Sequence, residues 1–281
     1  MTELLSYTIV DGIKCYSSDV AGGYQDYPDE GFDLTDSEAG SSFWILSRNR
    51  LFKRLVRQNM RSTGKTRLFE VGCGTGSFLR ELADVPDLAI VGSEIYRKGL
   101  VYAKATLPGV ELIQYDVTKG VTGSQFELVA AFDVLEHIER DRQAMENVHA
   151  MLADGGRFIL SVPQYQFLWS PLDDLVRHKR RYSRSDMTDK LKAAGFEIRY
   201  TTSFVFTLFP LMLAARLADK ANKAEVNEDA ALAKRVHFPA WQNWLFDRIM
   251  RLDEVLIGLG LSLPFGGTLV VVAEKPRAMA A

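Results

Sequence analysis

Apolar residues recur along this chain in two patterns, and the changes from one to the other predict the elements. Short apolar runs typical of buried strands lie at residues 67–71, 88–93, 110–115, 128–132, 157–162, 197–202 and 268–273. Helix-like apolar spacing lies between most of them, at residues 77–83, 96–106, 140–151 and 184–194. Strands that alternate with helices of this length form right-handed βαβ units, so the sequence predicts an α/β fold with a doubly wound, mainly parallel sheet.

The alternation is absent from both flanks of this region. Residues 1–40 have no sustained period and predict turns and short strands, whereas residues 43–60 have the spacing of an amphipathic helix. Between residues 204 and 267 two further helices are expected, at 208–223 and 239–261. In the second of these, six apolar residues share one face that we expect to be buried: Trp241, Leu245, Ile249, Leu252, Leu256 and Leu259.

This pattern divides the chain into three parts. We expect an N-terminal extension with a cap helix (1–66), a core (67–203 and 268–276) and a helical insertion (204–267) before the last strand. A chain of 281 residues is long enough for one such domain with additions.

Composition and charge narrow the classes of partner and compartment. The net charge is −2, which produces no overall field that would attract nucleic acid or anionic membrane. The two cysteines, Cys15 and Cys73, predict a reducing compartment, and the first residues lack the pattern of a secretion signal. The longest apolar run, residues 204–215, is shorter than the roughly 20 residues that span a bilayer. We therefore expect a cytoplasmic protein.

A glycine-rich turn follows the strand at 67–71. Gly72, Gly74 and Gly76 alternate between that strand and the next helix, which lets the backbone turn sharply and approach a ligand closely. The amides at the start of the helix would face that ligand. Ser77 stands where a dinucleotide fingerprint prefers Gly or Ala, so the pattern favours a ligand without a pyrophosphate.

Acidic residues end the next three strands. Glu94 is placed to accept both hydroxyl hydrogens of a ribose, and Asp116 to accept from an adenine amine, although a turn or helix-capping role suits Asp116 as well. Asp133 begins the segment Asp133-Val134-Leu135-Glu136-His137. Because the carboxyl ends of the strands in an open α/β sheet meet at one edge, these acids predict a single ligand site.

These motifs together resemble those of class I S-adenosylmethionine-dependent methyltransferases, of the bacterial type that acts on small molecules in quinone, lipid or sugar metabolism. The resemblance covers about residues 67–202 and 268–275, and it implies a seven-stranded Rossmann-like sheet whose last strand is antiparallel. The implied cofactor is S-adenosyl-L-methionine. The residues that the resemblance assigns to it are Glu70, Gly72, Cys73, Gly74, Gly76, Glu94, Ile95, Asp116, Val117, Phe132 and Asp133.

The segment at residues 42–49 resembles the cap helix of such enzymes, so Trp44 and Arg48 are expected to close over the cofactor, Arg48 on its carboxylate. The loop after the strand at 157–162 resembles their acceptor loop. It supplies the expected acceptor-binding residues Trp169, Arg181 and Tyr182. A cluster of basic residues at 177–184 suits a phosphate or carboxylate on the acceptor, or is a solvated entry to a helix.

Methyl transfer requires alignment and, for a protonated nucleophile, a base. His137 and His178 are rival candidates because both follow strands at the ligand edge. The four histidines are scattered along the sequence and neither cysteine has a partner at ligand spacing, so we predict no metal site.

Several functions and partners stay open. A nucleic-acid methyltransferase is disfavoured because the segment after residue 132 lacks an Asn/Asp-Pro-Pro-aromatic turn. An NAD-dependent oxidoreductase and a non-catalytic protein that binds the cofactor are also compatible with the sequence. Residues 204–223 suit a peripheral membrane contact, a lid, a homodimer contact or a buried hairpin.

Overall fold

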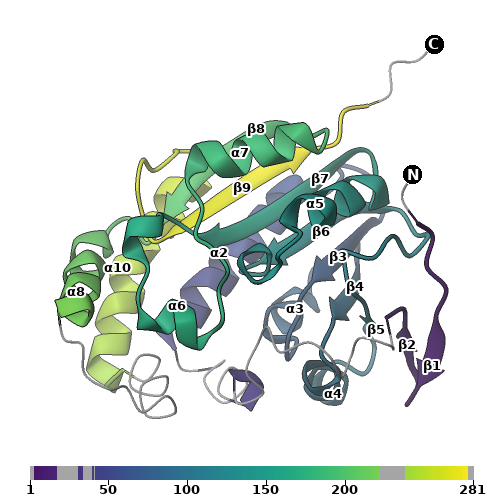
Figure 1. Ribbon diagram of the computed structural model, residues 1–281, viewed down its shortest axis with the longest axis horizontal. Helices are drawn as coiled ribbons and strands as arrows, with labels where there is room; N and C mark the ends of the chain where they lie inside the picture. The colour runs from purple at the N-terminus through teal and green to yellow at the C-terminus, as the bar shows by residue number, and fades with distance from the viewer. Residues whose placement is uncertain (1–2, 18–30, 34–39, 41, 222–237, 278–281) are drawn as a thin grey trace.

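The computed structural model describes residues 3–17, 31–33, 40, 42–221 and 238–277. One mixed sheet organises them, with the strand order β1-β2-β5-β4-β3-β6-β7-β9-β8 (Figure 1). The strands are β1 (Thr8–Val10), β2 (Ile13–Cys15), β3 (Thr66–Val71), β4 (Leu88–Glu94), β5 (Glu111–Gln114), β6 (Phe126–Phe132), β7 (Leu152–Pro163), β8 (Glu197–Phe204) and β9 (Thr268–Glu274). Strands β3 to β7 are parallel to one another, and β9 runs antiparallel between β7 and β8.

The predicted fold class and the antiparallel last strand are confirmed, but the strand count is corrected from seven to nine in the described residues. The hairpin β1–β2 adds the two extra strands, because β2 pairs in parallel with β5. Asp11 and Gly12 both have positive φ, which suits the two-residue turn of such a hairpin. The hairpin covers an edge of the sheet that would otherwise expose unpaired backbone groups.

Helices cover both faces of the sheet (Figure 1). Their bounds are α2 (Phe43–Asn59), α3 (Ser77–Leu82), α4 (Arg97–Thr106), α5 (Asp141–Met151), α6 (Pro171–Leu175), α7 (Arg184–Ala193), α8 (Phe209–Ala221) and α10 (Ala240–Gly258), with short 3₁₀ turns η1 (Leu135–His137) and η2 (Gln166–Leu168). Helices α5 and α7 pack with one face of the sheet around Phe69 and Phe158, and α2, α3 and α10 pack with the other around Leu68 and Ile159. Neighbouring strand residues therefore belong to opposite cores, as the two-residue period requires.

The cap helix and the insertion are joined by contacts between α2 and α10. Arg50 on α2 pairs with both Asp247 and Glu254 on α10 at 2.6 Å. Buried Asp253 accepts hydrogen bonds from the amides of Phe206 and Thr207, at 2.6 and 3.1 Å, just before α8. These polar contacts determine which side of α10 faces inward.

The predicted buried face of α10 is therefore wrong for four of its six residues, and only Ile249 and Leu256 pack against the core. The buried residues are Met250, Asp253 and Ile257, while Trp241 is 64% exposed and Leu259 is 73% exposed. Apolar residues occur on more than one side of this helix, and the ion pairs with α2 select the side that carries the acids. An apolar surface of α10 is therefore left exposed to solvent.

Among the described residues, no helix combines the length and apolar character that crossing a membrane would require.

Candidate functional site

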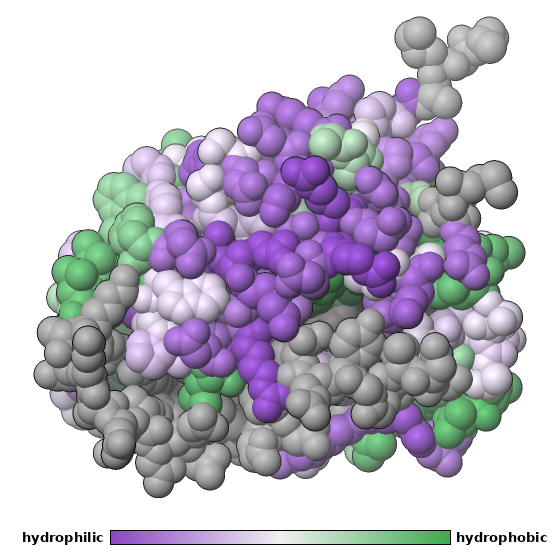
Figure 2. All heavy atoms as spheres, viewed as in Figure 1, coloured by the Kyte–Doolittle hydropathy of each residue, from purple (hydrophilic) through white to green (hydrophobic). Residues whose placement is uncertain are grey.

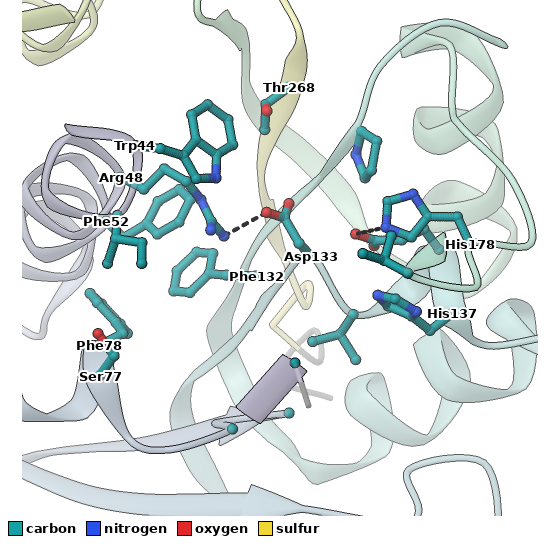
Figure 3. A pocket seen from close by; sticks show the side chains of 18 of the residues that line it. Trp44, Arg48, Phe52, Ser77, Phe78, Phe132, Asp133, His137, His178 and Thr268 are labelled. Atoms are coloured by element: carbon teal, nitrogen blue, oxygen red, sulfur yellow. Dashed lines mark ion pairs between the residues drawn. The ribbon is translucent and has the colours of Figure 1, made fainter. Parts of the chain in front are cut away.

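A cavity of about 1030 Å³ lies at the carboxyl ends of β3, β4, β5 and β6, the edge that the sequence predicts (Figure 3). Its other walls come from α2, from the segment between β7 and α7, and from α8 and α10. This volume is at the upper limit of the roughly 300–1,000 Å³ typical of small-molecule sites. The cavity therefore has room for more than one small ligand.

The glycine loop forms the floor of the cavity, and its three glycines, Gly72, Gly74 and Gly76, have different structural roles. All three have positive φ: 70° at Gly72, 55° at Gly74 and 78° at Gly76. A Cβ on Gly72 would lie 2.5 Å from Val134, and one on Gly76 would lie 2.8 Å from Leu107. A Cβ on Gly74 would have no atom within 4 Å and would enter the open cavity.

Gly76 is thus not placed as predicted. It does not line the cavity, and its role is to let α3 approach α4 at Ala103 and Leu107. Gly72, Cys73 and Gly74 do line the cavity. Burial raises the pKa of the Cys73 thiol well above its usual value, which disfavours the thiolate.

Glu94 lies at the end of β4 with its carboxylate fixed by backbone amides. Its Oε2 accepts from Gly74 N at 3.0 Å, and its Oε1 accepts from Ile95 N at 2.8 Å and from Tyr96 N at 3.1 Å. Burial raises its pKa, and these three hydrogen bonds oppose the rise. The side chain is thus held in one orientation against the glycine loop before any ligand arrives.

Glu70, at the end of β3, is the second buried carboxylate of this floor. It is 3% exposed, and its Oε2 accepts no hydrogen bond from the described residues. Burial, followed by the charge of Glu94, raises the pKa of Glu70 to about 8.

Asp116, after β5, is also buried against the cavity, and its Oδ1 accepts from both the amide and the hydroxyl of Thr118 at 2.8 Å. Asp116 therefore shapes its own turn, a role that its position in the sequence also suits.

Arg48 and Asp133 join the cap helix to the end of β6. Arg48 Nη2 lies 2.5 Å from Asp133 Oδ2, and the guanidinium lies over the rings of Trp44 and Phe52, each centroid 5.3 Å away (Figure 3). Asp133 has a φ of 55°, and its Oδ1 accepts from the Ser161 hydroxyl at 2.8 Å. Arg48 thus pairs with a protein carboxylate in this structure, while its expected contact with a cofactor carboxylate stays a prediction.

The two candidate bases, His137 and His178, lie next to each other at the far side of the cavity. Their ring centroids are 4.8 Å apart, at an interplanar angle of 74° (Figure 3). His178 Nδ1 lies 2.9 Å from Asp173 Oδ1, and its Nε2 lies 3.9 Å from Glu136 Oε1. Although these histidines are far apart in the sequence, the fold brings them together with the buried carboxylate of Glu136.

The carboxylates around this pair differ in their environments. Burial alone would raise the pKa of Asp173, but hydrogen bonds from His178 and Arg181 hold it well below its usual value. Burial, followed by the charge of Asp133, raises the pKa of Glu136 well above its usual value. Asp173 is therefore the stable anion of this group.

The expected acceptor-binding residues are placed differently from the prediction. Tyr182 is fully buried and donates its hydroxyl to Asp141 Oδ2 at 2.9 Å, so it is a core residue. Trp169 does not line the cavity, and its Nε1 donates to Asp174 Oδ1 at 3.0 Å. Arg181 does line the cavity, but its fork binds Asp173 at 2.8 and 3.0 Å. Asp173 and Asp174 belong to the same predicted loop, whereas Asp141 lies on α5.

The remaining predicted residues line the cavity: Trp44, Glu70, Ile95, Val117, Phe132 and Asp133. Sequence reasoning missed Glu136 and Asp173 as site residues. It also missed the apolar wall from the insertion, which includes Leu208, Met212 and Phe246. Glu136 lies within a segment that the sequence singled out, and Asp173 lies within the predicted acceptor loop, but the sequence assigned a role to neither.

Comparison with known proteins agrees with this geometry. The model of a family described as "Methyltransferase domain" matches residues 40–201. A probable S-adenosylmethionine-dependent methyltransferase of Mycolicibacterium smegmatis is 26% identical over 167 residues. That match covers 58% of this chain and 63% of the relative, which is less than two thirds of its length.

Solved structures share the fold at low identity. Phosphoethanolamine N-methyltransferase 2 of Haemonchus contortus, in complex with S-adenosyl-L-methionine, is similar with a TM-score of 0.57 and 14% identity, over 92% of this chain and 60% of that one. The cyclase SpnF is similar with a TM-score of 0.54 and 18% identity, over 82% of both chains. At such identities the likeness shows the fold alone, and function has to be argued from the site.

Proposed function

This chain belongs to the methyltransferase-domain family, and from that premise we propose that it transfers the methyl group of S-adenosyl-L-methionine to a small-molecule acceptor. The observation that carries the proposal is one continuous cavity with two chemically different ends. One end has the glycine loop with Glu70, Glu94 and Asp116, and the other has the histidine pair and the apolar side chains of α8 and α10. A cofactor and an acceptor can therefore meet inside a single space.

The cofactor end suits the polar parts of S-adenosylmethionine. Glu94 retains lone-pair capacity beyond its three amide donors, which suits the hydroxyl hydrogens of a ribose. Asp116 and Val117 lie on the adjacent wall, as an adenine would require, and the backbone at Gly74 is open to the cavity. These positions support the assignment of the cofactor to this end.

The reaction itself is a direct displacement. An acceptor lone pair forms a bond to the methyl carbon, and the carbon–sulfur bond breaks with its electron pair left on sulfur, which yields S-adenosylhomocysteine. A protonated acceptor transfers its proton to a base, for which His137 and His178 are the candidates at this end of the cavity. The protein mainly aligns the two reactants and excludes water.

The wall of the acceptor end favours an acceptor with an apolar body. Val205, Leu208, Met212 and Phe246 line this part, beyond Trp44 of the cap helix. The polar groups at this end are the histidines, Arg216 and the carboxylates near them. We propose an amphiphilic acceptor whose nucleophilic group faces the histidine pair and whose apolar part lies along α8.

Thermal unfolding with S-adenosylhomocysteine and with NAD, each in separate samples, tests the cofactor assignment. A ligand that binds the native state raises the melting temperature by linkage, so we expect a rise with S-adenosylhomocysteine alone. The matched controls are Glu94→Ala, which should lose the rise, and Glu81→Ala on the exposed side of α3, which should keep it. A rise with NAD and none with S-adenosylhomocysteine would overturn the proposal.

We also propose that the outer face of α8 and α10 contacts a lipid surface from which such an acceptor is drawn. This face carries large exposed apolar side chains: Leu217, Trp241, Trp244, Leu245, Leu252 and Leu259. Figure 2 shows hydrophobic residues gathered over α8 at the left of the molecule. Arg248 and Arg251 share this side of α10, with the Arg248 guanidinium over the Trp244 ring. Tryptophan beside arginine on an apolar helix face is the composition of interfacial helices.

Vesicle sedimentation tests this contact. We expect binding to vesicles that contain an anionic phospholipid, weaker binding to neutral phosphatidylcholine, and loss of at least about tenfold in affinity in the Trp241→Ser/Trp244→Ser variant. Val101→Ser, at a 63% exposed apolar residue on α4, is the matched control and should bind as the parent does. Concentration-dependent dimerisation that the same double variant abolishes, without vesicle binding, would refute the lipid contact and identify a second copy as the occupant.

A further inference from the structure

Three potential metal ligands meet at the acceptor end of the cavity. Glu136 and His137 come from η1, which follows β6, and His178 comes from the segment between α6 and α7 (Figure 3). Their ligand atoms all lie within 4.8 Å of one another. The separation is fixed by a backbone hydrogen bond from Lys179 N to Glu136 O at 2.8 Å, which ties the two segments together.

The buried carboxylate of Glu136 lacks hydrogen-bond donors among the described residues. Its side chain is fully buried, and neither carboxylate oxygen accepts a hydrogen bond from any described residue. The two neighbouring acids are each neutralised by an arginine, Asp133 by Arg48 and Asp173 by Arg181. A buried carboxylate without donors is costly, and native proteins satisfy such groups with a cation, water or a ligand. Glu136 therefore faces a position that suits a positive charge.

His178 is oriented toward that same position. Asp173 Oδ1 lies 2.9 Å from Nδ1, and Asp173 is itself held by the fork of Arg181 and by the amide of Ser170 at 2.9 Å. A charged carboxylate at Nδ1 selects the tautomer with hydrogen on Nδ1, because the carboxylate can only accept. The lone pair of Nε2 then points toward Glu136 Oε1, 3.9 Å away. Two electron-rich atoms that face each other in a buried site need a proton or a metal cation between them.

We propose that Glu136, His137 and His178 bind one divalent metal ion of the class that prefers imidazole with carboxylate, such as Zn²⁺, Co²⁺ or Mn²⁺. Metal–ligand bonds of about 2.0–2.2 Å at tetrahedral angles place two ligand atoms about 3.3–3.6 Å apart, so ligand atoms that lie within 4.8 Å of one another have to approach by at most about 1.5 Å. Asp173 is the outer carboxylate that orients His178, an arrangement common around metal-bound histidines.

Three protein ligands leave coordination positions open, and all three residues line the cavity. Given the proposed function, on which this part of the inference rests, an oxygen of the acceptor occupies an open position. A bound cation lowers the pKa of a coordinated hydroxyl and fixes its direction toward the methyl group. The two histidines then act as ligands, and the proton of the hydroxyl passes to solvent instead of to either of the rival bases that the sequence predicts.

Metal binding is measured on the full chain after treatment with a chelator, by titration with Co²⁺ and its visible absorbance. We expect one equivalent to bind, with displacement by Zn²⁺. Glu136→Gln and His178→Ala should each weaken Co²⁺ binding by at least about tenfold, and the positioning variant Asp173→Asn by about 10- to 100-fold. The matched control is His149→Ala, which removes a histidine of α5 outside the cavity and should bind Co²⁺ as the parent does.

The thermal rise with S-adenosylhomocysteine separates a lost metal from a lost fold, since folded variants keep it. Stoichiometric Co²⁺ binding that survives unchanged in His178→Ala and Glu136→Gln would overturn the metal site, as would a parent protein that binds no Co²⁺. Co²⁺ binding without any rise with S-adenosylhomocysteine would leave the metal site standing and refute the proposed function. If both hold, the chelator should abolish methyl transfer to an oxygen acceptor while the thermal rise persists.

Discussion

Arg48 of the cap helix and Asp133 at the end of β6 form an ion pair of 2.5 Å inside the cavity. The pair joins two parts of the chain that the sequence assigns to different units. Both side chains are partly buried, at 18% and 24% exposure, so solvent screens the pair less than it screens a surface pair. The cap helix is thus attached to the sheet at the point where the two ends of the cavity meet.

A double-mutant cycle on this pair should reveal strong coupling. We expect Arg48→Ala and Asp133→Asn to have a coupling energy of about 1–3 kcal/mol in the free energy of unfolding, measured with urea. Asparagine is the appropriate replacement because it tolerates the positive φ at this position. The exposed pair Lys14–Glu111 is the control and should couple by less than about 1 kcal/mol. Equal coupling in the two cycles would contradict the expected difference.

Alanine at Gly74 and at Gly76 should separate ligand binding from stability. Gly76→Ala places a methyl group against Leu107 and Ala103 at positive φ, and we expect it to cost about 2–4 kcal/mol of stability. Gly74→Ala has only the backbone strain, about 1–2 kcal/mol, but its methyl group enters the cavity. Calorimetric titration should therefore find weaker binding of S-adenosylhomocysteine in Gly74→Ala. Normal affinity in that variant would refute the close approach of the cofactor.

Removal of the Glu94 carboxylate should weaken cofactor binding by about 10- to 100-fold, because a charge-assisted hydrogen bond to a ribose hydroxyl is lost. Glu94→Gln should also weaken cofactor binding. Its NH₂ group is a donor, so it would face one of the backbone amides that now donate to the carboxylate. Titration calorimetry with S-adenosylhomocysteine measures both, with Glu81→Gln as the control. Affinity unchanged in Glu94→Ala would remove Glu94 from the ribose site.

The pH dependence of stability should carry a signature of Glu70. Its pKa is about 8 in the folded protein and 4.5 for the free side chain. Between these two pH values the folded state therefore keeps a proton that the unfolded state has released. Stability is then fully present below pH 4.5 and falls as pH rises toward 8, by at most about 1.4 kcal/mol per pH unit. Glu70→Gln should lack this fall. Urea unfolding across that range compares the two, and equal slopes would show that Glu70 is ionised in the folded state.

Local chemistry explains why much of the cofactor end is predictable. The glycine loop needs positive φ within a few residues of β3, and Glu94, Asp116 and Asp133 each end a strand of a parallel sheet. The shared edge follows from the rule that parallel strands end on the same side. For these residues the strand pattern alone implies that they are neighbours.

The acceptor end depends on contacts between distant segments. Glu136, Asp173 and His178 meet only after the loop before α7 folds against η1, and Arg181 binds Asp173 because that loop is buried. The sequence pattern makes Tyr182 available for an acceptor, yet in the fold its hydroxyl is committed to Asp141 in the core.

Helix α10 shows the same division between sequence and tertiary structure. By itself the sequence determined that a helix lies within residues 239–261, because helix formation depends on local spacing and propensity. Only the tertiary structure decided which side is buried, since Arg50 on α2 and the amides before α8 needed the acids of α10 as partners. Satisfying those buried polar groups outweighed the burial of Trp241 and Leu259, which therefore remain on the surface.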